Sequence, residues 1–264
     1  MKRLRFALLL VLFCSSCAMA QTDSLNRYFL DFRGGGGYGL YRDFGAAPFT
    51  FTGVELAPGI AFASQHPQWR WQVSLDVVGG MYGVGSPTWQ ISGGVADLSA
   101  EYLYRLGGQG YWQWWVGGGV DDLFDMRYNA GLSNADMGFS NFLRVNMLAR
   151  IEYVRPRWMM WGQMGLSPMA LMLRPGFAYI DNFNHILATS SANLFDEYHW
   201  YLAGAVGMDT ELGVSLLLSN GNRVGLAYQW HHATSHASVD GVSAPYRFDQ
   251  ASHLLRIHLQ FCLK

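Results

Sequence analysis

The feature that most constrains the fold of this chain is a two-residue alternation of apolar and polar side chains. In "WRWQVSLDV", residues 69–77, every odd position is apolar and every even position is Arg, Gln, Ser or Asp. In "LRIHLQF", residues 255–261, Arg256, His258 and Gln260 separate four apolar residues. Successive side chains of a β-strand point to opposite faces, so this pattern predicts extended strands that each have one wholly apolar face.

The alternation recurs along the whole chain, and no linker or domain boundary interrupts it. Short connections at 64–68, 107–110, 155–157 and 219–222 alternate with longer ones at 43–49, 84–89, 127–137, 174–196 and 234–249. The "NG" at Asn220 and Gly221 predicts a tight hairpin turn with positive φ at both positions. The pattern predicts about ten strands, at 27–42, 50–64, 69–83, 90–106, 111–126, 138–154, 157–173, 197–218, 222–233 and 250–263.

The first twenty residues differ from the rest. Lys2, Arg3 and Arg5 precede the apolar run "FALLLVLF", and "AMA" follows at 18–20. This order is typical of a cleaved secretory signal peptide, so we expect a signal at 1–20 and one exported domain at 21–264. The alternative is a lipoprotein that begins at an acylated Cys17.

Charged residues make up 14% of the chain, against about 25% in ordinary soluble domains, whereas hydrophobic residues make up an ordinary 50%. After residue 20 no run of 18 or more apolar residues remains to form a spanning helix. A closed barrel is the other structure that satisfies every backbone group in lipid. The sequence therefore predicts an all-β, antiparallel, up-and-down transmembrane β-barrel.

Aromatic residues sort by strand end on the apolar faces. Two girdles of aromatic residues around a barrel, at a fixed separation, are typical of a barrel that crosses both interfaces of a membrane. The predicted girdles are formed by Trp69, Trp71, Trp112 and Trp158 near the short connections, and by Trp200 and Trp230 near the long ones.

With a C-terminal strand of alternating apolar residues that includes Phe261, the chain resembles the small bacterial outer-membrane β-barrels. In that family the aromatic is the final residue, whereas here Cys262, Leu263 and Lys264 follow it. The sequence pattern of the chain is also similar to that of uncharacterised barrels from Bacteroidota. The resemblance implies export through a Sec-type signal, residence in the outer membrane, contact with lipid and lipopolysaccharide, and insertion by the barrel-assembly machinery.

The polar faces carry most of the charged strand residues, and charges inside a narrow barrel must pair. We predict an Arg and carboxylate network that fills the lumen, in which Asp97, Glu101 and Asp121 serve Arg144 and Arg150. The alternative is a narrow passive pore for small polar solutes. The predicted network consists of Arg70, Asp76, Asp97, Glu101, Arg105, Asp121, Arg144, Arg150, Glu152 and Arg256.

Other motifs carry weaker signals. "GGGGYG" at 34–39 matches a dinucleotide-binding pattern, but it lies in a strand. We expect its glycines either to make room for bulky lumen side chains or to allow a sharp bend. His231, His232 and His236 lack a metal-ligand spacing. A second alternative function is a hydrolase at the rim, with Asp121 and Asp122 as an acid pair or Ser235 and His236 as a nucleophile pair. The sequence predicts no catalytic, metal or cofactor site.

The remaining expectations concern partners. The net charge of −1 does not favour nucleic-acid binding. The long segments at 174–196 and 234–249 are expected either to cover the mouth of the barrel as a lid or to bind an external ligand, and no small-molecule ligand is indicated.

Overall fold

The computed structural model describes residues 26–43, 47–85, 90–129, 137–173, 198–235 and 248–263. Every regular element in these residues is a β-strand, and no helix among them is long and apolar enough to cross a membrane. The strands are β1 (Arg27–Asp43), β2 (Ala47–Leu56), β3 (Gly59–Gln65), β4 (Trp69–Gly83), β5 (Gln90–Gly107), β6 (Trp112–Asn129), β7 (Met137–Val154), β8 (Trp158–Leu173), β9 (Tyr198–Leu217), β10 (Arg223–Ser235) and β11 (Phe248–Leu263).

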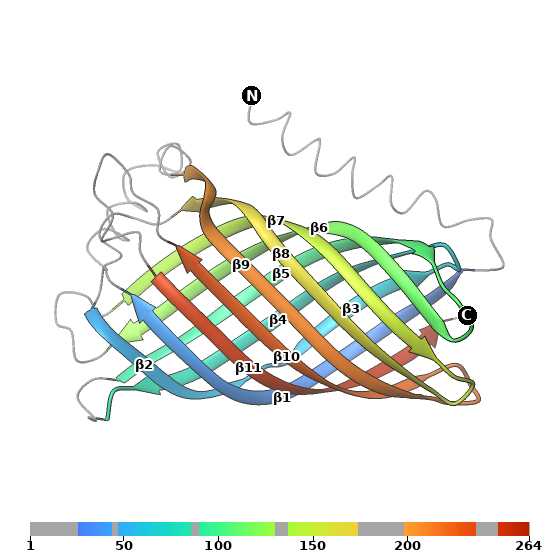
Figure 1. Cartoon of the computed structure of the whole chain (residues 1–264). Helices are drawn as coiled ribbons and strands as arrows, with labels where there is room; N and C mark the ends of the chain where they lie inside the picture. Colours follow the sequence, from blue (N-terminus) through green and yellow to red (C-terminus); the bar gives the residue numbers. More distant parts are fainter. Residues whose placement is uncertain are drawn as a thin grey trace.

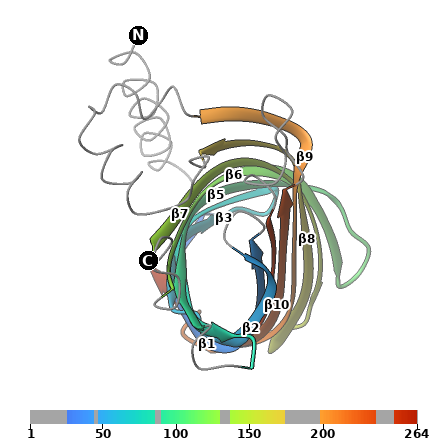
Figure 2. The ribbon, with the colours of Figure 1, turned by 90° about the vertical axis from the view of Figure 1, so that its left-hand side faces the viewer.

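The strands form one closed barrel. From β4 onward each strand pairs antiparallel with the next, and β11 pairs with β1 from Tyr28↔Leu263 to Asp43↔Phe248. Figure 1 shows the tilted wall from the side, and Figure 2 shows the ring of strands from one end. The predicted fold class, an all-β antiparallel up-and-down barrel, is confirmed.

Two of the eleven strands are halves of a single wall strand. Both β2 and β3 pair with β1 on one side and with β4 on the other, in one continuous register. The interruption falls at Pro58, which has no backbone N–H to donate. The Ala57 N–H still donates to the Gly35 carbonyl at 2.9 Å, and the Pro58 carbonyl accepts from Val77 at 2.9 Å. The wall therefore contains ten strands, as the sequence predicts.

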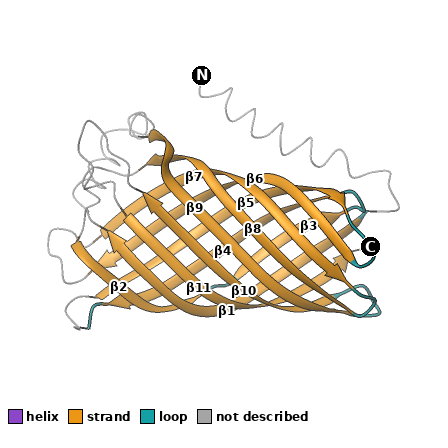
Figure 3. Cartoon of the chain, in the orientation of Figure 1, coloured by secondary structure: helices purple, strands orange, loops and turns teal. Residues whose placement is uncertain are grey.

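The two ends of the barrel differ. One end, called here the turn end, holds the tight connections at 66–68, 108–111, 155–157 and 218–222, the start of β1 and the end of β11 (Figures 1 and 3). The opposite end is called the far end. The predicted long connections join strands there, but most of their residues, at 44–46, 86–89, 130–136, 174–197 and 236–247, lie outside the described residues, as does the predicted signal peptide.

The "NG" segment forms a hairpin turn, but not the predicted two-residue one. Gly221 donates to the Leu218 carbonyl at 3.0 Å, and Leu218 donates to the Asn222 carbonyl at 2.9 Å, so three residues form the loop. Gly221 has φ of +87°. This is the hairpin class in which a glycine with positive φ follows the turn. The Asn222 side chain accepts from the Cys262 N–H at 3.0 Å, which ties the turn to β11.

The predicted division into two faces is confirmed. On β11, Leu255 and Ile257 are each 54% exposed on the outside, whereas Arg256 between them is 2% exposed. Leu56 on β2 is 72% exposed, and its neighbour Glu55 is 3% exposed. The barrel thus presents aliphatic side chains outward and charged side chains inward, the reverse of a soluble protein.

The glycine run on β1 makes room for the lumen, as predicted. A Cβ at Gly37 would overlap the main-chain carbonyl of His253, and a Cβ at Gly39 would overlap the carboxylate of Glu55. A Cβ at Gly35 would lie 2.9 Å from the Cγ of Arg256. Every second position of this segment faces inward, so the glycines permit β1 and β11 to approach closely.

The pairing of β8 and β9 departs from the regular strands that the sequence predicts. Ser167 pairs with Gly207, but Met169, two residues later, pairs with Leu202. Residues 203–206 of β9 therefore lie opposite Pro168 alone, because proline cannot donate a ladder hydrogen bond. The period-two pattern carries no signal for this bulge.

Apolar side chains occupy the lumen at both ends. At the far end two clusters face inward, and at the turn end two smaller clusters do so. The far-end clusters are Tyr41, Phe51, Tyr82 and Ile91, and Leu123, Phe142, Ala170, Met172 and Ala233. The turn-end clusters are Leu103, Trp115 and Leu148, and Met159, Trp161 and Ala227.

Candidate functional site

The candidate site is the polar part of the lumen, which encloses a cavity of about 240 Å³. Its lining reaches Gln65, Arg70 and Arg223, among the last inward positions of their strands at the turn end. The lining does not include Tyr41, Phe51, Tyr82 or Ile91, the first of the far-end clusters. In the described part of the chain the cavity therefore extends toward the turn end and does not reach the first far-end cluster. Its lining does include Leu123 of the second far-end cluster, beside which a narrow pocket of about 20 Å³ continues past Phe142 and Ala233.

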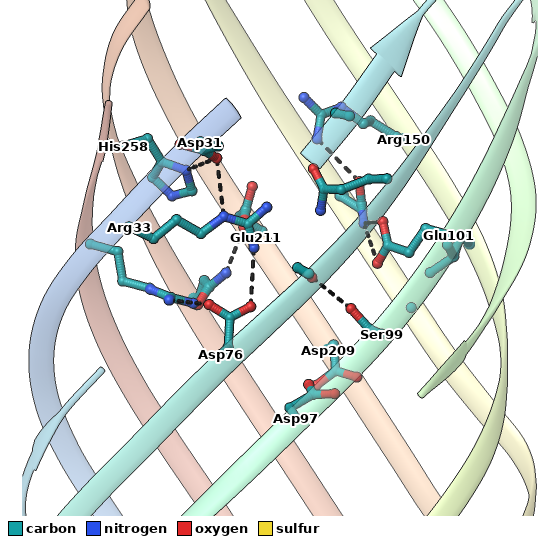
Figure 4. A pocket seen from close by; sticks show the side chains of 18 of the residues that line it. Asp31, Arg33, Asp76, Asp97, Ser99, Glu101, Arg150, Asp209, Glu211 and His258 are labelled. Carbon is teal, nitrogen blue, oxygen red and sulfur yellow. Dashed lines mark hydrogen bonds and ion pairs between the residues drawn. The ribbon is translucent and has the colours of Figure 1, made fainter. Parts of the chain in front are cut away.

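The first group of charges joins β1, β4 and β11. Arg33 donates to Asp31 at 3.0 Å and to Asp76 at 3.1 Å. Arg256 donates to the other oxygen of Asp76, and His258 Nδ1 lies 3.1 Å from Asp31. Figure 4 shows these side chains converging from the wall into the cavity. The group links the first and last strands of the barrel across their seam.

The second group lies nearer the turn end. Glu152 accepts from Arg70 at 2.6 Å and from Arg150 at 2.8 Å. The guanidinium of Arg70 lies 4.7 Å from the centre of the Trp115 ring, and that of Arg150 lies 5.3 Å from the Trp161 ring. Planar guanidinium groups stack well on indole rings, so the two tryptophans hold the arginines in place.

The third group lies nearer the far end. Arg144 donates two hydrogen bonds of 2.8 Å to the two oxygens of Asp121, a bidentate pair, and one of 3.4 Å to Asp209. Asn146 donates to Asp121 at 2.6 Å, and His231 bonds to Asp209. The two side chains of the Arg144 and Asp121 pair are 5% and 4% exposed, so this is a buried, geometrically specific interaction.

Carboxylates outnumber guanidinium groups on the inward positions between the two rims. The described residues place ten carboxylates and seven arginines there. The carboxylates are Asp31, Glu55, Asp76, Asp97, Glu101, Asp121, Asp125, Glu152, Asp209 and Glu211, and the arginines are Arg33, Arg70, Arg127, Arg144, Arg150, Arg223 and Arg256. The described lumen therefore holds three more carboxylates than guanidinium groups.

Four of these carboxylates accept no hydrogen bond from an arginine or histidine. Glu55 accepts from Tyr82 at 2.7 Å and from Ser252 at 3.0 Å, outside the cavity. Glu101 accepts only from Gln163, at 3.2 Å and 3.4 Å.

The other two also line the cavity. Glu211 accepts from Trp161 at 2.5 Å and from Gln229 at 2.6 Å. Asp97 has a buried Oδ1 without a hydrogen-bond partner. Three carboxylates on the cavity wall thus lack a cation bonded to them.

The structure pairs seven of the ten residues in the predicted network and leaves three apart. Asp121 serves Arg144, but Arg150 bonds to Glu152 and Gln163 instead of the predicted Glu101 or Asp97. Arg105 was predicted wrongly: it lies at the turn-end rim and donates to the carbonyls of Gly107 and Pro67 at 3.5 Å each. Arg105 is the next to last inward residue before a turn, so its long side chain reaches the backbone of the turn instead of the lumen.

Five of the six predicted girdle residues lie on outward positions. At the turn end Trp71 packs against Phe62, with ring centres 5.5 Å apart. Trp112 lies 4.8 Å and Trp158 lies 5.4 Å from the Tyr153 ring. Trp69 stacks on His66, and at the far end Trp230 stacks on His232 and His253. Trp200 belongs to β9, and its side chain lies outside the described part of the structure.

The sequence analysis assigned no role to two tryptophans that face inward, Trp115 and Trp161. Their position was readable from parity: Trp112 and Trp114 share one face of β6, so Trp115 must point the other way. Trp115 is 2% exposed and Trp161 is 8% exposed.

The sequence motifs that suggested chemistry do not converge. Asp121 faces the lumen, whereas Asp122 faces outward and bonds to Asn141, so the two do not form an acid pair. His231 faces the lumen and His232 faces outward. His236 and the Ser235 side chain lie outside the described residues. Among the residues that the structure describes, no group of three His, Cys, Asp or Glu side chains is arranged to hold a metal ion.

Comparisons with known proteins bear on the fold alone. No protein-family model and no curated protein matches the sequence. The structure is similar to the outer membrane protease OmpT from Escherichia coli, with a TM-score of 0.51 and 8% identity over 90% of this chain and 96% of that chain. It is also similar to the Neisserial surface protein NspA, with a TM-score of 0.39 and 9% identity over 89% of this chain and 97% of that chain. This chain has the fold of a bacterial outer-membrane β-barrel.

Proposed function

We propose that the chain is a closed, structural barrel of the bacterial outer membrane whose lumen does not conduct ions. The observation that carries this proposal is the filled lumen: three groups of buried ion pairs bridge its walls, and apolar clusters occupy both ends. A ten-stranded barrel has an interior only slightly wider than an eight-stranded one, which side chains fill.

The narrowing of the cavity toward the far end supports the closed barrel over the alternative of a passive pore. A pore needs a continuous wide polar path, whereas the cavity does not reach Tyr41, Phe51 and Tyr82 and narrows to about 20 Å³ beside Phe142. The alternative of a rim hydrolase has less support, because Asp121 and Asp122 point to opposite faces. The protease activity in the name of OmpT belongs to that protein and is not transferred here.

The same proposal includes the location and partners of the chain. The outward aliphatic face between two aromatic belts supports contact with outer-membrane lipid and lipopolysaccharide, with the turn end in the periplasm. The proposal also includes export through the signal at residues 1–20, insertion by the barrel-assembly machinery and ligand binding by the far-end segments. Limited proteolysis of intact cells at the far-end segments would test the orientation.

A planar bilayer experiment tests the closed lumen. We expect purified wild-type protein to insert without steady conductance, because the ion pairs and apolar clusters leave no path. The double variant Phe51→Ala and Phe142→Ala removes one ring from each far-end cluster, and we expect it to show measurable current steps. Phe124→Ala removes an outward ring and is the matched control, which should stay silent.

Stable, ion-selective single-channel steps from the wild-type protein would replace the closed barrel with the pore. Silence of both the wild type and the double variant would show that the far-end clusters are not the barrier.

A further inference from the structure

We infer that the lumen cavity binds a small linear diamine, whose two ammonium groups meet carboxylates at two levels of the barrel. The inference concerns the cavity wall and is independent of whether the barrel conducts, since its readout is ligand binding. It begins from the surplus of carboxylates over arginines in the described lumen.

Removing a carboxylate from water costs several kcal/mol unless a cation or several hydrogen-bond donors replace the water. Most lumen carboxylates have such donors, but Asp97 has a buried Oδ1 with none, and Glu101 accepts only from one neutral amide. Glu211 accepts from two neutral donors. The nearby Arg33, Arg144 and Arg150 donate to other carboxylates, so among the described residues these three carboxylates have no cation bonded to them.

The carboxylates form two levels. Asp97 and Glu101 belong to β5, and Asp209 and Glu211 belong to β9, four wall strands away in a ring of ten. Asp97 interacts electrostatically with Asp209, and Glu101 does so with Glu211. Figure 4 shows all four side chains entering the same space from these two walls. Each level therefore has carboxylates from facing walls. Asp97 and Asp209 form one level, where both Asp209 oxygens already bond to Arg144 and His231, and Glu101 and Glu211 form the other.

The spacing of the two levels selects the ligand. At a rise of about 3.3 Å per residue, Asp97 and Glu101 are about 13 Å apart along β5, and Asp209 and Glu211 about 7 Å apart along β9. With strands tilted by about 40°, the levels are roughly 5 to 10 Å apart along the barrel axis. An extended diamine with a chain of four or five carbons spans about 6 to 7 Å, at about 1.2 Å per bond.

The size and the lining of the cavity also limit which ligands it can bind. Its volume of about 240 Å³ is below the range of about 300 to 1,000 Å³ that suits drug-sized ligands. Ca²⁺ and Mg²⁺ prefer six or more oxygen ligands, and the described residues contain no group of three His, Cys, Asp or Glu side chains arranged to hold a metal ion. An ammonium group needs only three acceptors. The lining reaches the turn end, which gives the diamine its route of entry.

Calorimetry on the folded full-length protein in detergent tests the inference. The probes are 1,4-diaminobutane and 1,5-diaminopentane, with butylamine as a single-charge control, all at one ionic strength. We expect the diamines to bind at least about tenfold more tightly than butylamine, because a second charge-assisted contact adds about 1.5–3 kcal/mol. Equal binding of diamine and monoamine, or no binding at millimolar concentration, would overturn the inference.

Two variants locate the site. Asp97→Asn and Glu101→Gln each keep the size of the side chain and remove one charge, and each should weaken diamine binding by about tenfold. Asp122→Asn removes the same charge from the outward face and should bind as the wild type does. Wild-type affinity in both lumen variants would place the ligand elsewhere and sink the proposal. If a variant fails to fold, the comparison of diamine with monoamine on the wild type still decides.

Discussion

At the scale of single residues, the lumen is held together by ion pairs in which hydrogen bonds orient both partners. Arg144 illustrates this: two of its nitrogens meet both oxygens of Asp121, and Asn146 holds one of those oxygens from the same strand as Arg144. A guanidinium presents its donors in a rigid fork, so lysine could not replace Arg144 without losing one contact. The absence of internal lysine from the sequence fits this requirement.

The variant Arg144→Met should therefore destabilise the barrel. Removing one partner of a buried pair leaves the other without its counter-charge, at a cost of about 3–5 kcal/mol. We expect Arg144→Met to unfold at a lower temperature on a heat-modifiability gel. Adding Asp121→Asn, which removes the leftover charge, should restore part of the loss. Unchanged heat resistance of Arg144→Met would mean that water reaches Asp121 and that the lumen at this level is wet.

The difference between the predicted and observed partners of the arginines shows what a sequence can specify. Parity assigns each charge to a face, and it did so correctly for Arg144, Arg150 and Glu152. Contacts across the lumen depend on the shear and diameter of the barrel, which parity does not contain. The bond from Arg70 to Glu152 and that from Arg256 to Asp76 join distant strands for this reason.

At the scale of the element, the packing of β1 depends on glycine positions that have no side chain. Its inward glycines allow the chain to pass close to β11, and its outward glycine Gly34 has nothing within 4 Å of an added Cβ. The strand therefore contains both a crowded and an open glycine position. The sequence alone predicted the strand and the space that its glycines provide. It could not predict which glycine positions are crowded, because the crowding arises from the backbone of another strand.

Alanine substitutions on β1 test this difference. Gly37→Ala would place a methyl group against the His253 carbonyl, and overpacking of this kind costs about 1–3 kcal/mol. We expect a lower yield of folded barrel in detergent refolding and a lower unfolding temperature. Gly34→Ala, three residues away on the same strand, is the matched control and should fold as the wild type does. Equal behaviour of the two variants would refute the close approach.

At the scale of the whole molecule, tryptophans divide into two populations by direction. Trp112 and Trp230 lie outward at opposite ends, whereas Trp115 lies inward beneath Arg70. Aromatic belts at two heights predict that the protein crosses a bilayer with each belt at headgroup depth. A soluble barrel would place no such constraint on the outward rings.

Depth-dependent quenching by brominated lipids tests the arrangement in variants that keep a single tryptophan. We expect Trp112 and Trp230 to be quenched most by lipids brominated near the headgroup. Trp115 should be insensitive to bromine at every depth, because the wall separates it from lipid. Equal quenching of Trp112 and Trp115 would show that the faces are assigned wrongly.

The seam between β1 and β11 affects the order in which the barrel folds. The nearest partners across it in the sequence are Asp43 and Phe248, so the edge of β1 stays unpaired until β11 reaches it. Contacts this distant along the chain form slowly, and an open strand edge pairs readily with foreign strands. We therefore expect closure of the barrel to be the last step of its folding, and a variant without β11 should leave the β1 edge exposed to aggregation.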